Sequence, residues 1–523
     1  MKKIVTDLLI SLLFIFLATN ICTGQYSSKQ VDSIVTYAMN KFNVAGVAVG
    51  IVKDGQIIHT KGYGVKSSVT KRPVDAHTNF AIASNSKAFT TAALAILVEE
   101  GKLSWQDKVK DHIPEFKMYN SYVTENFNIQ DLLTHRSGLG LGVGDLMFFP
   151  DGTDFTMDDL LGSFQHFKPV SAFRTKFDYD NLLYLVAGEV VKRVSGVSYE
   201  DFITRRIFEP LQMDNTYAEL MRIKNHENLA TPHSSEGELL KPLPNFQEMI
   251  NSAAGGIYSN VDDICNWMLV HLNKGVYGTN LQDTLFTISS QREMWKMHTV
   301  LEANKNPRYN THFSGYGLGW SLSDIKGNML VQHTGGLPGM LSITVMIPDI
   351  DLGIIILTNT SDDGAGLFGS VSRTLIDNYL GLEDFGWIDK YASYFEARKE
   401  KGDSVTQQVW KTVKKADSAH INESDYIGVY EDAWFGKVEV FKKGELLWIK
   451  AHRSPKLNGR MYYYKANTFA IKWDYQDMNA DAFAMFSLDE NGKAQSIKMK
   501  GISPNIDFSF DFQDLNLSRI KNQ

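Results

Sequence analysis

Ser84-Asn85-Ser86-Lys87 opens the most informative segment of the sequence, an apolar run that covers residues 87–100 and stops at Gly101. The apolar residues recur at helical spacing, at Phe89, Ala92, Ala93, Ile96 and Leu97. Residues three apart on a helix share one face, so the Lys87 ammonium can lie beside the Ser84 hydroxyl and favour its anionic form. The segment therefore predicts a helix with a candidate nucleophile at its start.

The serine–lysine spacing alone is not specific. The same pattern occurs at Ser68/Lys71, Ser323/Lys326 and Ser518/Lys521, but none of these pairs opens an amphipathic helix. An alternative for Ser84 or Ser86 is a helix N-cap, a position that serine commonly occupies.

The composition is that of an ordinary globular protein. A length of 523 residues suffices for about two to four domains. Hydrophobic residues make up 43% and charged residues 22% of the chain. The net charge of −7 and the absence of a basic stripe argue against nucleic acid as a partner.

The sequence predicts no cofactor and no metal. The 13 histidines are scattered, there is no H-E-x-x-H, and two cysteines are too few for a zinc site. No dinucleotide-binding loop is recognisable. Gly317 and Gly319 lie in a strand-like run, where they predict close strand packing.

The first residues predict a secretory signal peptide. Lys2 and Lys3 precede an apolar run, residues 8–18, that is too short to span a bilayer comfortably. Cleavage before Gln25 would make the protein secreted or periplasmic. The alternatives are a retained N-terminal anchor and lipid attachment at Cys22, although Ile21 fits a lipidation motif poorly. Without Cys22, the chain has only Cys265 and no internal disulfide.

Strand patterns occur on both sides of a helical segment. A helix over 27–42 precedes a hairpin of strands 47–52 and 56–63, with short helices following between 103 and 211. Strands return at 316–322, 329–333, 341–347 and 352–359, before a helix over 367–380. We therefore expect an α+β fold in which one antiparallel sheet is flanked by helices, with a cleft between the sheet and a helical subdomain.

The rest of the chain changes character. Residues 384–424 read as a charged helical linker, and 425–523 as an all-β domain of about eight strands, a sandwich or a small barrel. Its expected strands include residues 462–473 and 506–512. The predicted division is thus 1–24, 25–383, 384–424 and 425–523. The last domain either packs as a cap or shapes substrate access and oligomerisation.

Two further stretches carry chemistry. In Tyr179-Asp180-Asn181, a tyrosine near a lysine can relay a proton, and the asparagine offers both a donor and an acceptor. His333-Thr334-Gly335-Gly336 is expected at the end of a strand, where glycines let a ligand approach and an exposed N–H can stabilise an oxyanion. The alternative for the second stretch is a tight turn with a structural histidine. A second Y-x-N at 258–260 is better explained as a helix cap.

Together, these motifs resemble the serine β-lactamase and penicillin-binding-protein superfamily, in the branch with class C β-lactamases, D-stereospecific peptidases and esterases. The resemblance covers residues 27–380. It rests on Ser84/Lys87, Tyr179/Asn181, the His-Thr-Gly from His333, and Leu-Leu-Thr-His-Arg-Ser-Gly-Leu at 132–139, in the family's order. The last of these stretches is expected to support the site without chemistry of its own. The C-terminal domain resembles the lipocalin-like domain appended to some of these peptidases.

The resemblance implies an acyl-enzyme mechanism. Ser84 would attack a carbonyl while Lys87 and Tyr179 move its proton and later activate water. The backbone N–H groups of Ser84 and Gly336 would form the oxyanion hole. Substrate contacts would come from Asn181, His333, Thr334 and Gly335.

The third motif departs from the β-lactamase pattern, because His333 stands where class C enzymes usually have lysine, whose charge helps to hold the antibiotic carboxylate. Histidine there resembles the DD-peptidase and D-aminopeptidase relatives. The expected substrate is therefore a small amide or ester, above all a peptide bond at a D-residue, with β-lactams as acylating ligands. A carboxylesterase, a β-lactamase and a non-catalytic cell-wall peptide-binding protein remain alternatives.

Overall fold

The computed structural model describes residues 25–237, 239–247, 250, 252–416 and 421–520. The predicted signal peptide, with its apolar run and Cys22, lies outside these ranges. None of the helices in the described ranges has both the length and the apolar character needed to span a bilayer.

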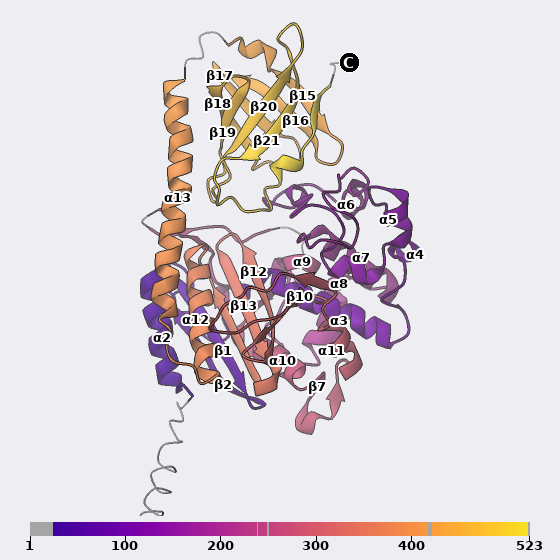
Figure 1. Ribbon diagram of the computed structural model, residues 1–523, viewed down its shortest axis with the longest axis vertical. Coiled ribbons are helices and arrows are strands. Elements are labelled where there is room, and N and C mark those ends of the chain that lie inside the picture. The colour runs from indigo at the N-terminus through magenta and orange to yellow at the C-terminus, as the bar shows by residue number, and fades with distance from the viewer. Residues whose placement is uncertain (1–24, 238, 248–249, 251, 417–420, 521–523) are drawn as a thin grey trace, which may run out of the picture.

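An eight-stranded antiparallel sheet lies at the centre of the first domain, in the order β2-β1-β14-β13-β12-β11-β10-β9 (Figure 1). Its strands come from both ends of the first domain, as the sequence predicted. The bounds are β1 Gly46–Lys53, β2 Gln56–Gly64, β9 Thr299–Leu301, β10 Ser314–Tyr316, β11 Ser321–Ile325, β12 Asn328–Leu337, β13 Met340–Ile347 and β14 Leu352–Thr358.

The sheet is covered on both faces. Strands β1 and β14 are buried along nearly their whole lengths, so they appear in the sequence as continuous apolar runs instead of alternating ones. Helices α2 (Ser28–Phe42) and α12 (Asp363–Tyr379) pack on one face, and α10 (Val261–Leu272) on the other. Gly50 allows α10 to approach β1, since a Cβ there would lie 2.7 Å from the Cys265 sulfur.

A mostly helical insertion, residues 65–298, lies between β2 and β9 (Figure 1). Its helix α3 (Ser86–Glu99) is buried along most of its length and packs against α7 (Leu182–Ser195) and α9 (Ser252–Gly255). The remaining helices are α4 Val109–His112, α5 Ser121–Asn126, α6 Met157–Ser163, α8 Tyr199–Ile203 and α11 Ile288–Met294.

Helix α13 (Trp387–Lys415) runs beside α12 and leads up to the C-terminal domain (Figure 1). That domain is a closed antiparallel barrel of eight strands, which confirms the all-β prediction and selects the barrel over the sandwich. Its strands are β15 Gly428–Asp432, β16 Gly436–Lys443, β17 Leu446–Ala451, β18 Asn458–Lys465, β19 Thr468–Trp473, β20 Ala482–Leu488, β21 Ala494–Gly501 and β22 Leu517–Arg519.

The barrel docks on the helical insertion by polar and aromatic contacts. Arg453 of the barrel forms ion pairs with Asp154 and Asp159, at 2.6 and 2.8 Å. Phe149 of the insertion meets Phe510 edge to face, with ring centroids 5.0 Å apart. Apolar residues of the two domains accordingly belong to one buried cluster.

Three strand predictions were wrong. Residues 316–322 and 462–473 each contain a turn between two paired strands, β10/β11 and β18/β19, because glycine or a left-handed residue reverses the chain at Gly319 (φ 76°) and Ala466 (φ 46°). Gly319 therefore lies in a hairpin turn and not within a strand. Residues 506–512, although alternately apolar, form a loop between β21 and β22 that leaves the barrel for the helical insertion.

Candidate active site

Ser84 lies in a short 3-10 turn, η1 (Ala83–Asn85), immediately before α3. Its side chain is partly exposed, whereas Asn85, Ser86 and Lys87 are buried. The capping alternative does not apply, because Asn85 is the N-cap residue of α3 and makes no side-chain cap bond. Ser86 Oγ instead accepts a hydrogen bond from Ile257 N.

The Lys87 amine is fully buried and has three hydrogen-bond partners. Its Nζ lies 3.0 Å from Ser84 Oγ, 2.7 Å from Asn181 Oδ1 and 2.9 Å from the Ala254 carbonyl oxygen. Burial lowers the pKa of Lys87 to about 7, an effect that the carboxyl groups of Asp145 and Asp180 oppose. The unprotonated form of the amine is therefore substantially populated near neutral pH.

Tyr179 lies on the other side of this amine. Lys87 Nζ is 4.8 Å from the centroid of its ring. Burial raises the pKa of Tyr179 well above its usual value, an effect that the nearby Ser84 hydroxyl opposes. The phenol is therefore a proton donor at neutral pH and not a phenolate.

Asn181 has a different set of partners from the one expected. Its Oδ1 accepts from Lys87, and its Nδ2 donates to Asp145 Oδ2 at 2.8 Å. Both ends of the amide are thus engaged within the protein, and only the second Nδ2 hydrogen remains for a substrate carbonyl. No motif or periodic pattern in the sequence indicated Asp145, which opens the 3-10 turn η3 (Asp145–Met147) after a glycine-rich loop of the helical insertion.

The His-Thr-Gly motif lies within β12 and not at its end. Strand β11 pairs with β12 only as far as Gln332, so residues 333–337 pair with β13 alone and leave one edge free. Leu337 and Met340 flank a two-residue turn, which makes Gly336 and Leu341 a non-hydrogen-bonded pair. The N–H of Gly336 therefore points to the free edge, where it meets the cavity.

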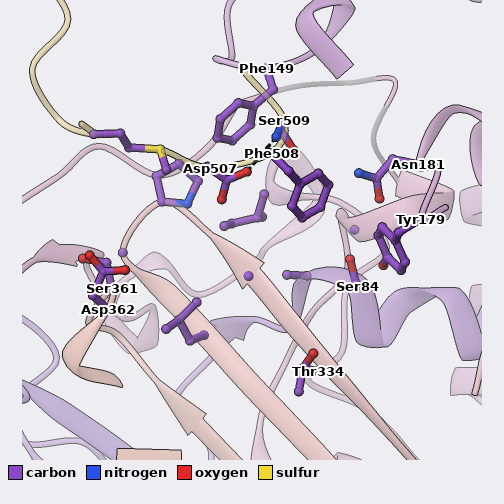
Figure 2. A pocket seen from close by; sticks show the side chains of 18 of the residues that line it. Ser84, Phe149, Tyr179, Asn181, Thr334, Ser361, Asp362, Asp507, Phe508 and Ser509 are labelled. Atoms are coloured by element: carbon purple, nitrogen blue, oxygen red, sulfur yellow. Dashed lines mark hydrogen bonds between the residues drawn. The ribbon is translucent and has the colours of Figure 1, made fainter. Parts of the chain in front are cut away.

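Gly335 brings this strand against the nucleophile. A Cβ at Gly335 would lie 2.1 Å from the Ile82 carbonyl oxygen and 3.0 Å from Ser84 N. Only glycine allows the strand and the serine turn to approach so closely. Because side chains alternate along a strand, Thr334 lies on the face of β12 opposite His333 and Gly335. Thr334 is exposed and lines the same cavity as Ser84 (Figure 2).

His333 is buried and neutral. Burial, together with the positive charge of Lys87, lowers its pKa to about 3. Its Nε2 lies 2.9 Å from the Tyr316 hydroxyl, and its ring lies 6.3 Å from that of Tyr179. His333 thus faces the tyrosines and carries no charge for a substrate carboxylate.

The segment 132–139 supports Tyr179 from behind. The His135 ring packs on the Tyr179 ring with centroids 4.3 Å apart, and its Nδ1 lies 3.1 Å from Asp180 N. The Leu133 carbonyl accepts a hydrogen bond from Tyr184, whose ring lies 5.3 Å from Lys87 Nζ. The role of this stretch is one of support.

A cavity of about 580 Å³ opens above Ser84 and is lined by both domains. Figure 2 shows Ser84, Tyr179 and Asn181 on the right of the pocket, with Phe508 of the barrel loop beside them and Asp507 further to the left. Phe508 meets Tyr179 edge to face at 5.9 Å. Across the described ranges, no group of three or more His, Cys, Asp or Glu side chains is arranged to hold a metal ion.

A sheet flanked by helices, with a serine, a buried lysine and a tyrosine at one cavity, defines the class of β-lactamase-fold serine hydrolases. Residues 31–369 match the beta-lactamase family, and residues 413–519 match a domain of unknown function, DUF3471. Because the first match covers well over half of the sequence, the chain belongs to the beta-lactamase family and is a serine hydrolase.

The relatives are distant. Unguisins hydrolase ungD' of Aspergillus campestris is 25% identical over 404 residues, which are 75% of this chain and 73% of that protein. Protein flp of Staphylococcus aureus is 27% identical over 341 residues, 64% of each chain, so this chain spans less than two thirds of protein flp. The octameric penicillin-binding protein homologue from Pyrococcus abyssi shares the fold, with a TM-score of 0.60 at 21% identity, over 91% of this chain and 98% of its own.

Gly335→Ala should separate β12 from Ser84, because the added methyl group has no room against the Ile82 carbonyl. We expect a loss of about 1–3 kcal/mol in unfolding free energy and a loss of Ser84 reactivity toward a fluorophosphonate probe. The matched control is Gly162→Ala in α6, where a Cβ meets no atom within 4 Å. Reactivity and stability retained in Gly335→Ala would contradict the close approach.

Proposed function

We propose that this protein hydrolyses small amides through an acyl-enzyme on Ser84, with the neutral Lys87 amine as the base. The observation that carries the proposal is the set of partners around Lys87 Nζ. Asn181 Oδ1 and the Ala254 carbonyl can only accept hydrogen bonds, so they take two N–H groups of the amine. The remaining tetrahedral position faces Ser84 Oγ, and in the neutral amine it holds the lone pair.

Such an amine can take the Ser84 proton as Oγ attacks the carbonyl carbon. The protonated Tyr179 phenol, which lies near Ser84, then gives its proton to the leaving amine, and the Lys87 ammonium returns the Ser84 proton to the phenolate. In the second half of the cycle, the same groups take a proton from a water molecule as it attacks the acyl-enzyme ester on Ser84, and they return a proton to the Ser84 oxygen.

The oxyanion hole of this proposal consists of two backbone N–H groups. Ser84 N lies at the turn before α3, and Gly336 N points from the free edge of β12. Donors fixed by the backbone need no reorganisation as negative charge develops on the carbonyl oxygen.

The preferred substrate in this proposal is a peptide with a D-residue and a free amino group, as for a D-aminopeptidase. A neutral His333 in place of lysine offers nothing to an antibiotic carboxylate. The cavity lining includes the carboxyl groups of Glu236, Asp362, Asp477 and Asp507, beside the Arg398 guanidinium. Asp477 pairs with Lys241, and burial raises the pKa of the other three, that of Glu236 to about 7. Their oxygens can accept hydrogen bonds from a substrate ammonium, which favours a cationic substrate. The proposed setting is secreted or periplasmic, where such peptides from cell walls are found.

The Ser84 assignment can be tested with a fluorescent fluorophosphonate and mass analysis of the labelled peptide. The wild-type protein should carry the label on Ser84, and Ser84→Ala should carry none. Ser68→Ala is the matched control, since Ser68 belongs to another serine–lysine pair of the same spacing. Labelling that persists in Ser84→Ala would refute the nucleophile, and a wild-type protein that takes no acylating probe would favour a binding protein.

The rate of this labelling should depend on pH through Lys87. Its pKa is lowered to about 7 by burial, so the ammonium predominates below pH 7 and the neutral base above it. The rate constant should therefore rise about tenfold per pH unit below 7 and level off above. Stopped-flow labelling between pH 5 and 9 measures this profile, and a rate that still rises past pH 9 would exclude a neutral Lys87.

The substrate proposal can be tested with matched alanine peptides in the L and D forms, with free or acetylated N-termini. Purified protein should release product fastest from the D-peptide with a free amine, and Ser84→Ala should release none. Faster turnover of p-nitrophenyl esters would instead favour an esterase. Rapid nitrocefin hydrolysis would favour a β-lactamase. Either result would overturn the peptide proposal while leaving the acyl-enzyme intact.

A further inference from the structure

The barrel loop, residues 502–516 between β21 and β22, enters the helical insertion and bonds with the segment that carries Asp145. Ser509 Oγ donates to Asp145 Oδ2 at 2.8 Å. Asp511, which is fully buried, accepts from Gly144 N at 2.7 Å and from Leu146 N at 3.0 Å. The barrel loop therefore forms hydrogen bonds with both the backbone of this segment and the side chain of Asp145.

The same Asp145 oxygen is connected to the Lys87 amine by two hydrogen bonds through Asn181. Besides Ser509, Asp145 Oδ2 accepts from Asn181 Nδ2 at 2.8 Å, and Asn181 Oδ1 accepts from Lys87 at 2.7 Å. A continuous series of hydrogen bonds therefore runs from the barrel to the base. The Asp145 carboxyl is its branching point.

Packing alone is a poor explanation for these groups. Aromatic contacts and the Arg453 ion pairs already dock the barrel. Asp145 and Asp511 are both fully buried, and burial raises the pKa of each carboxyl group well above its usual value; the nearby Asp145 raises that of Asp511 further. Burying two carboxyl groups costs free energy that docking by aromatic contacts and surface ion pairs does not require.

We propose that Ser509 is a positioning residue for Lys87, acting through Asp145 and Asn181, so that the barrel completes the hydrolase site. The proposal rests on the role proposed for Lys87 above. Ser509 and Asn181 together fix the orientation of the Asp145 carboxyl. Asp145 in turn fixes the plane of the Asn181 amide, which aims its Oδ1 at the amine. Without the Ser509 hydroxyl, Asp145 is free to turn and the amine loses a fixed acceptor.

Ser509→Ala in the full chain should slow the chemical step without weakening probe binding. With the fluorophosphonate, we expect the maximal labelling rate constant to fall about tenfold and the half-saturating probe concentration to stay within about twofold. Ser509→Thr keeps the hydroxyl and should restore most of the rate. Ser503→Ala is the matched control, because Ser503 lies in the same loop and bonds with Asn479 and Asn505 instead.

A double variant of Ser509 and Asp145 distinguishes a positioning role of Ser509 from a general loosening of the loop. If Ser509 acts through Asp145, then Ser509→Ala should cause no further loss in an Asp145→Ala background. Equal thermal midpoints for Ser509→Ala and Ser503→Ala would show that stability does not differ between them.

Three results would overturn the proposal: an unchanged rate in Ser509→Ala, an equal loss in Ser503→Ala, or additive losses in the double variant. If Asp145→Ala does not fold, failure of Ser509→Thr to restore the rate refutes it instead. Each of these results presupposes that wild-type protein labels at Ser84. Absence of that label would count against the proposed function, and not against the role of Ser509.

Discussion

The buried amine of Lys87 is the constraint on which the rest of this site depends. An ammonium removed from water is costly, and this one meets only neutral acceptors at hydrogen-bond distance. Part of that cost disappears when the proton leaves, which is why burial lowers the pKa of Lys87 to about 7. In the proposed mechanism, burial therefore supplies a neutral amine that can act as a base near neutral pH.

Three parts of the chain must meet for this to work. The η1 turn carries Ser84 and the helix α3 that follows it carries Lys87. Other segments of the helical insertion supply Tyr179, Asn181 and Ala254, and β12 closes the site with its free edge. Gly335 sets the distance between strand and serine. The barrel adds a fourth part, because Phe508 forms a wall of the cavity and Ser509 reaches Asp145.

Much of this could be predicted from the sequence. The period of residues 87–100 indicated α3, and the strand patterns at 47–52 and 56–63 indicated the β1–β2 hairpin, whose turn has left-handed residues at Asp54 and Gly55. Ser84, Tyr179, Asn181, His333 and Gly336 were all named from motifs, and the structure brings them to one cavity. Lys87 and Gly335, also named, lie against Ser84 behind its lining. Thr334 was named with them and also lines this cavity, although its side chain lies on the face of β12 opposite His333.

The remainder could not be predicted because it depends on docking between domains. Asp145 belongs to no periodic segment, and its partner Ser509 is 364 residues away in the sequence. The apolar alternation at 506–512 indicated a strand. Phe508 and Phe510 alternate instead because they pack against Tyr179 and Phe149 of the other domain. A period of two reports which residues are buried, and not what buries them.

Direct titration of the Lys87 amine is the most incisive measurement. The protein would be labelled with ¹³C at the lysine ε-carbon, and the chemical shift of the Lys87 signal would report the protonation of its amine by NMR. The Lys87 signal would be assigned as the one present in Ser84→Ala and missing from the double variant Ser84→Ala/Lys87→Met. We predict a midpoint near pH 7, far below those of the surface lysines. A midpoint near 10.5, the ordinary value for lysine, would contradict the central claim that burial makes Lys87 the base.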